Sequence, residues 1–105
     1  MIQVSYAYEG KTVVLTMRGH ANGKPGTDNL VCASASTLFG TFAVMTEIYA
    51  KDIQACEIKN ESGDGMVVVT AKDEQTYGEL VRCLMFVITG LRLLGTQGDV
   101  EFVEL

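Results

Sequence analysis

Residues 2–18 read IQVSYAYEGKTVVLTMR, and two alternating runs within this stretch decide the fold class. In residues 2–8, large apolar side chains stand at every second position, which is the period of a strand with one buried face. Residues 11–18 repeat the alternation, and Glu9-Gly10 between the two runs predicts a tight turn. The stretch therefore predicts a β-hairpin as the first unit of a sheet.

A helix is predicted over residues 30–50, after a loop that contains three glycines and one proline between residues 19 and 26. Apolar residues recur in the helix at spacings of three and four, which indicates an apolar stripe. Because charged residues are scarce, we expect the helix to be well buried, with Asp28 or Asn29 as its N-cap. The predicted stripe consists of Val31, Ala35, Leu38, Phe42, Met45 and Tyr49.

The second half of the chain repeats the order of hairpin and helix. Residues 53–60 and 65–71 predict a second hairpin, and Asp73 is expected to cap a helix that ends at Gly95. Residues 99–104 predict a last short strand. The order ββαββαβ indicates a two-layer α/β (α+β) sandwich, in which a mixed or antiparallel sheet of about five strands carries both helices on one face.

Three apolar residues of the second predicted helix, Met85, Phe86 and Leu93, lie off its main stripe. They widen the apolar surface of this helix beyond what one packing partner needs. A dimer interface would explain them, and so would a deep groove filled by the first helix.

The composition indicates one domain, residues 1–105, without a nucleic-acid or membrane partner. The formal net charge of −5 would repel a polyanion, so direct nucleic-acid binding is not expected. No basic segment followed by an apolar run opens the chain, which predicts a cytoplasmic protein. The apolar stretch 80–94 is short and contains two arginines, so no membrane span is expected there. The three cysteines form neither a CxxC pair nor a Cys/His cluster, so no metal or other cofactor is expected.

Cys32 and His20 are the candidates for chemistry. Cys32 is expected in the first turn of its helix, where unpaired backbone N–H groups and the helix dipole favour the thiolate. His20 is the only histidine, and its imidazole titrates near neutrality, so it is the candidate general base. A strand end and a helix start can meet at one edge of a two-layer domain, which would bring nucleophile and base together. The alternative is that both are ordinary structural residues.

Three further residues can support this pair. Ser36 lies one helical turn after Cys32 and can donate a hydrogen bond towards the thiolate or a substrate, although a role in helix packing is the alternative. Asp28 and Asn29 can orient the imidazole, and N-capping is the alternative for both. We expect the loop over residues 20–29 to be mobile when no substrate is bound.

Residues 19–36 resemble the signature of the ribosomal-processing cysteine protease family (Prp), which reads G-H-A, a loop, and then D-I-V-C-A-x-x-S. Gly19-His20-Ala21 and the later LVCASAS run match it, and the spacing of twelve from histidine to cysteine is the same. The resemblance implies that Cys32 is the nucleophile and His20 its base, with Gly19 and Ser36 at the flanking motif positions. The family's aspartate aligns with Asn29, and Asp28 lies one residue earlier, so either residue can fill the orienting role.

The resemblance also implies a function and a partner. Members of the family are thiol proteases (hydrolases) that remove a short N-terminal extension from protein twenty-seven of the large ribosomal subunit, after aromatic residues, and so support ribosome biogenesis. They have an α/β sandwich fold and are usually homodimers. Two other functions remain open for this sequence: a non-catalytic dimeric module that binds a peptide or a ribosomal protein, and another thiol-dependent acyl-transfer enzyme.

Overall fold

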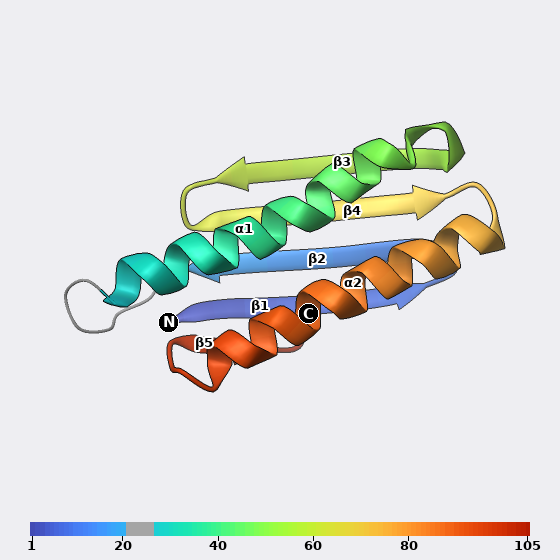
Figure 1. Cartoon of the computed structure of the whole chain (residues 1–105). Helices are drawn as coiled ribbons and strands as arrows, with labels where there is room; N and C mark the ends of the chain where they lie inside the picture. Colours follow the sequence, from blue (N-terminus) through green and yellow to red (C-terminus); the bar gives the residue numbers. More distant parts are fainter. Residues whose placement is uncertain (21–26) are drawn as a thin grey trace.

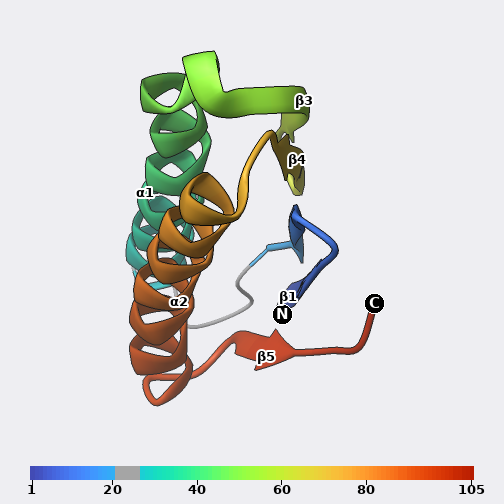
Figure 2. The same cartoon turned by 90° about the vertical axis from the view of Figure 1, so that its right-hand side faces the viewer.

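A five-stranded sheet carries two long helices on one of its faces, as Figure 1 and Figure 2 show. The computed structural model describes residues 1–20 and 27–105, with residues 27–29 described by their backbone only. The elements in chain order are β1 (Ile2–Glu9), β2 (Thr12–Gly19), α1 (Thr27–Ile48), the short 3₁₀ helix η1 (Ala50–Asp52), β3 (Ile53–Glu61), β4 (Asp64–Ala71), α2 (Glu74–Gly95) and β5 (Val100–Phe102). The predicted order ββαββαβ and the placement of both helices on one face are confirmed.

The sheet is mixed, with strand order β3-β4-β2-β1-β5. Both predicted hairpins form, and β2 pairs antiparallel with β4, so that the two hairpins stand side by side. The short strand β5 pairs with β1 in parallel, with Ile2 opposite Val100. A parallel neighbour requires a crossover connection, and α2 supplies it.

We predicted the turn of the first hairpin at Glu9-Gly10, but it lies one residue later. Its two central residues, Gly10 and Lys11, have φ angles of 57° and 70°. Positive φ at both central residues is the geometry that matches the twist of a two-residue hairpin. In the second hairpin Glu61 pairs with Asp64, and Gly63 has a φ angle of 74°.

The core lies between the sheet and the helices. Alternate residues of each central strand point towards the helices and are buried, as their sequence period predicts. The helices approach each other closely at Gly90, because a methyl group added there would lie 2.8 Å from the Leu38 side chain. The fully buried apolar side chains of the strands and helices include Val4, Val13, Leu15, Val67, Val69, Ala35, Phe42, Leu80, Leu84 and Leu91.

Helix α1 is less buried than its composition predicts. It begins at Thr27 rather than residue 30, so Asp28 and Asn29 lie inside its first turn instead of before it. Leu30, Val44 and Ile48 on its outer side are 68%, 53% and 67% exposed. The expectation of a well-buried helix is therefore wrong, because one sheet can cover only one side of the helix.

Part of α1, Leu30–Ile48, is also long and apolar enough to cross a membrane. Length and composition alone are a weak indication, because core helices of soluble proteins meet the same criteria. Ala35, Phe39 and Phe42 of this segment are buried in the core. Packing on the sheet therefore accounts for the apolar character of this side.

Helix α2 begins after Asp73 and ends at Gly95, as predicted. Asp73 is its N-cap and accepts a hydrogen bond from the Thr76 N–H at 2.7 Å, which lowers the pKa of the Asp73 carboxyl. Gly95 is its last helical residue. Phe86 and Leu93 are 80% and 67% exposed, so the first helix does not cover them.

Candidate active site

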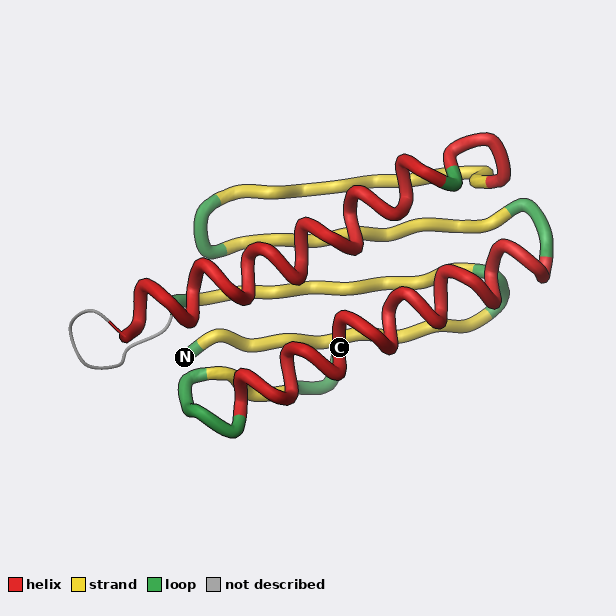
Figure 3. Tube along the Cα trace, in the orientation of Figure 1, coloured by secondary structure: helices red, strands yellow, loops and turns green. Residues whose placement is uncertain are grey.

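Three segments meet at one end of the sheet: the end of β2, the first turns of α1 and the turn between β3 and β4. In Figure 1 and Figure 3 the end of β2 and the β3–β4 turn lie at the same end of the sheet as the start of α1. Their side chains line a cavity of about 220 Å³. The lining residues are Ile2, Met17, Gly19, His20, Cys32, Ser36, Phe39, Asn60, Glu61, Ser62, Gly63, Asp64 and Gly65.

His20 directly follows β2, and its backbone is fixed from two sides. The Gly19 N–H donates to the Gly63 carbonyl oxygen at 3.0 Å, and the Met1 amino group donates to the His20 carbonyl oxygen at 2.5 Å. Gly19 has a φ angle of 93°, and a side chain there would collide with the Met1 carbonyl oxygen. The glycine before the histidine is thus required by the backbone path, and His20 itself is exposed at the cavity.

Cys32 lines the same cavity from α1. Its side chain is half-buried and packs against the edge of the core. Because α1 begins at Thr27, Cys32 lies in its second turn and not in the first turn, where we expected it. The favourable field of a helix N-terminus falls off within the first turn, so the dipole acts on the thiol less strongly than the sequence suggested.

Ser36 and Phe39 extend the wall that Cys32 begins. Ser36 lies one turn further along α1, is exposed, and lines the cavity together with Cys32. Phe39 is 2% exposed and forms the floor. Its ring packs on Gly65, because a methyl group added to Gly65 would lie 2.9 Å from Phe39 Cζ.

The β3–β4 turn is the part of the site that we did not predict. Residues 60–65 form one whole side of the cavity. The sequence held a signal, since Gly63 in this turn and Gly65 at the start of β4 stand two residues apart. Its position followed only from the sheet order: β4 pairs antiparallel with β2, so the start of β4 lies beside the end of β2.

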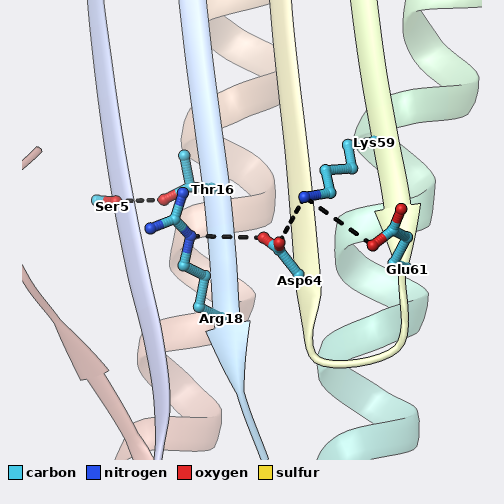
Figure 4. A network of polar contacts seen from close by, with 6 residues as sticks. All are labelled: Ser5, Thr16, Arg18, Lys59, Glu61 and Asp64. Atoms are coloured by element: carbon cyan, nitrogen blue, oxygen red, sulfur yellow. Dashed lines mark hydrogen bonds and ion pairs between the residues drawn. The ribbon is translucent and has the colours of Figure 1, made fainter.

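Charged side chains hold this turn on the face of the sheet away from the helices, as Figure 4 shows. Lys59 Nζ lies 2.7 Å from the Asp64 carboxylate and 3.9 Å from that of Glu61, and Arg18 Nε lies 3.5 Å from Asp64. The hydrogen bond from Lys59 lowers the pKa of the Asp64 carboxyl and raises the pKa of the Lys59 ammonium. Nearby on the same face, the hydroxyl groups of Ser5 and Thr16 share a buried hydrogen bond.

Asp28 and Asn29 lie in the first turn of α1, near the cavity in sequence, but their side chains are outside the part of the chain that is described. The expected mobility of the loop concerns chiefly residues 21–26, which are also outside it. Among the described residues, no three His, Cys, Asp or Glu side chains are grouped so that they could hold a metal ion.

The structure thus brings four predicted residues, Cys32, His20, Ser36 and Gly19, to one cavity. A thiol and an imidazole that face the same small cavity are the two groups that nucleophilic cysteine chemistry needs. The roles of nucleophile and base remain predictions from chemistry and from the motif.

Comparison with known proteins gives one family and one fold. The family model described as "Cysteine protease Prp" matches residues 1–96. No curated protein matches the chain. The structure is similar over its full length to the ribosomal processing protease Prp from S. aureus, solved with a substrate peptide (TM-score 0.68, 19% identity, 100% of both chains) and with a covalently linked product peptide (TM-score 0.67, 22% identity, 100% of both chains). It is also similar to SMU.848 from Streptococcus mutans (TM-score 0.65, 17% identity, 100% of this chain and 96% of that chain).

Proposed function

Because the chain belongs to the cysteine protease Prp family, we propose that it is an endopeptidase that removes an N-terminal extension from a ribosomal protein. The observation that carries the proposal is the shared cavity of His20 and Cys32. A family match over residues 1–96 favours a protease over a non-catalytic binding module or another acyl-transfer enzyme. The substrate class is supported by the S. aureus structure, which is described as a ribosomal processing protease with a substrate peptide.

The chemistry follows from a thiol beside an imidazole. His20 takes the proton from Cys32, and the Cys32 thiolate forms a bond to the carbonyl carbon of the scissile peptide. His20 then returns the proton to the departing amine, and an acyl-enzyme remains. Water, deprotonated by His20, hydrolyses the thioester and restores the thiol. The covalently linked product peptide of the S. aureus protein supports such an intermediate.

Three residues are proposed to assist. Asp28 or Asn29, in the first turn of α1, orients the imidazole, because either side chain offers an oxygen that can accept its N–H. Ser36 shares the cavity wall with Cys32, and its hydroxyl group can donate a hydrogen bond to a substrate carbonyl. The net charge of −5 favours the approach of a basic substrate, and ribosomal proteins are of that kind.

We also propose a homodimer in the cytoplasm. The outer sides of α1 and α2 expose apolar side chains that neither the sheet nor the other helix covers, above all Phe86 at 80%. A groove of about 360 Å³ between Thr41, Met45 and Phe86 is almost wholly apolar. A second copy of the chain is the occupant that would cover the same surface on both molecules. A ribosomal substrate supports the proposed cytoplasmic location.

The direct test is cleavage of the extended ribosomal protein, followed by mass spectrometry. We expect Cys32→Ala to abolish cleavage, and His20→Gln to lower the rate by roughly 10²–10⁴-fold, the usual contribution of a general base. Cys56→Ala is the matched control, because Cys56 is an exposed thiol that does not line the cavity. In the parent enzyme, iodoacetamide should modify Cys32 faster than Cys56 or Cys83. Cleavage by Cys32→Ala at the parental rate would contradict the proposal.

A further inference from the structure

Gly63, in the β3–β4 turn, lies directly against the imidazole of His20. A methyl group added to Gly63 would lie 2.6 Å from His20 Nε2 and 3.0 Å from His20 Cε1. Real Cβ atoms essentially never lie closer than 3.0 Å to another heavy atom, so any side chain at this position would have to displace the ring or the turn. The imidazole therefore occupies the space that the missing side chain leaves.

The same glycine also holds the backbone next to the histidine. The Gly63 carbonyl oxygen accepts the hydrogen bond from the Gly19 N–H at 3.0 Å. One residue thus contacts the imidazole of His20 and fixes the peptide that precedes it. The φ angle of 74° at Gly63 turns its backbone so that both contacts are made at once.

The turn that presents Gly63 is itself fastened on both faces of the sheet. On the open face, Asp64 is held by Lys59 at 2.7 Å and by Arg18 at 3.5 Å. On the helix face, Gly65 lies under the ring of Phe39, which is buried. A clash at Gly63 would therefore move the exposed imidazole more readily than the turn.

From these contacts we propose that Gly63 is a positioning residue: its bare Cα sets the direction in which the His20 imidazole faces the cavity that Cys32 lines. The inference rests on the proposed role of His20 as the base. Gly65 helps to position the other member of the pair, Cys32. Because Phe39 of α1 packs on Gly65, this glycine sets how closely the helix of Cys32 approaches the turn. The β3–β4 turn and the start of β4 thus fix both members of the pair relative to each other.

The test is the variant Gly63→Ala, compared with Gly10→Ala. Gly10 also has a positive φ angle in a hairpin turn, but a methyl group there meets nothing within 4 Å. It lies at the other end of the sheet, so Gly10→Ala carries the backbone strain without the clash. We expect Gly63→Ala to lower kcat by about 10²-fold with KM unchanged, as a small displacement of a catalytic group does, and Gly10→Ala to keep the parental kcat.

A second readout separates position from stability. The rate at which iodoacetamide modifies Cys32 should depend on pH differently in Gly63→Ala than in Gly10→Ala, because the displaced imidazole no longer faces the thiol. Modification is located by mass spectrometry, so that Cys56 and Cys83 do not contribute. Equal kcat values and equal pH profiles for the two folded variants would overturn the inference.

The unmodified protein supplies a measurement that does not depend on folding of the variants. The ring protons of His20 should show nuclear Overhauser effects to the Hα protons of Gly63, and their absence would overturn the inference directly. If the parent enzyme left the extended ribosomal protein uncut, the proposed substrate would be wrong, while these contacts and the Cys32 modification profile would still test Gly63. The two failures are therefore distinguishable.

Discussion

Gly65 and Phe39 pack against each other at the floor of the cavity. The Phe39 ring lies directly on the backbone of Gly65. The ring is 2% exposed, and a methyl group at Gly65 would come within 3.1 Å of three of its carbon atoms, the nearest at 2.9 Å. A closely packed ring has no free volume into which it can withdraw. The glycine is needed for packing, because its φ angle is not in the left-handed region.

We therefore expect Gly65→Ala to lower the free energy of unfolding by about 1–3 kcal/mol, the usual cost of overpacking a core. Urea unfolding followed by circular dichroism measures this change. Replacing Phe39 by Leu in the same protein should restore part of the loss, because the smaller side chain makes room for the methyl group.

Gly78→Ala is the matched control for this substitution. Gly78 lies on the exposed side of α2, and a methyl group there meets nothing within 4 Å. A glycine replaced by alanine within a helix should stabilise the protein by about 0.5–1 kcal/mol. If Gly65→Ala proved as stable as Gly78→Ala, the packing of Phe39 on Gly65 would be wrong.

The sequence allowed residues such as Cys32, His20 and Ser36 to be chosen, because their chemistry is rare and their spacing is local. His20 is the only histidine, and Ser36 follows Cys32 by one helical turn. Gly63 could not be found in this way. A glycine has no reactive side chain, and whether it can position a catalytic residue depends on which side chain lies opposite it in the folded chain.

Among the elements, the β3–β4 hairpin carries ion pairs that involve Lys59, Glu61 and Asp64. Lys59 donates a hydrogen bond to Asp64, which lowers the pKa of this carboxyl from its ordinary value of 3.8. A carboxyl with a lower pKa in the folded than in the unfolded chain stabilises the fold above its unfolded pKa. This contribution is lost as the pH falls through the folded pKa.

We accordingly expect Asp64→Asn to be less stable than the parent at pH 7, with the difference disappearing towards pH 2. The effect is small, because exposed ion pairs contribute little. Urea unfolding midpoints of both proteins at the two pH values measure it. Lys59→Gln should show the same disappearance, because its partner is uncharged in acid. A deficit of Asp64→Asn that is as large at pH 2 as at pH 7 would contradict the assignment.

Helix α1 shows why the elements could be located more reliably than their buried faces. Of the predicted stripe, Ala35 and Phe42 are buried, and its members Val31, Leu38 and Tyr49 are partly buried against the core. Phe39 and Thr46, which we did not predict, are buried as well. Apolar and small residues surround almost the whole helix, so the pattern of three and four fits more than one side. The strands were easier, because their period of two allows only two faces.

The molecule as a whole is elongated, with extents of 45 × 21 × 20 Å, and the two helices run along its length. Their outer sides form the surface on which we place the second copy. Phe86 lies in α2, and Val44 and Ile48 lie in α1, each more than half exposed. Exposed apolar surface of this extent is typical of an interaction site.

We expect the parent protein to sediment as a dimer and Phe86→Glu to sediment as a monomer. A buried aromatic anchor contributes about 2 kcal/mol or more to an interface, and a charge in its place adds the cost of burying it. Analytical ultracentrifugation across a range of concentrations measures the dissociation constant. Tyr8→Glu is the matched control, since Tyr8 is an aromatic residue 46% exposed on β1, away from the outer side of the helices. A parent protein that is monomeric throughout would contradict the proposed dimer.

The parallel pairing of β5 with β1 could not be predicted from the sequence, and it has a consequence for how the chain assembles. Each hairpin joins residues close together in sequence, whereas Ile2 and Val100 enclose nearly the whole chain. Closing so long a loop costs more conformational entropy, and contacts across long separations form slowly. We therefore expect the two hairpins to form early and β5 to dock last, so that the edge of β1 stays open longest during folding.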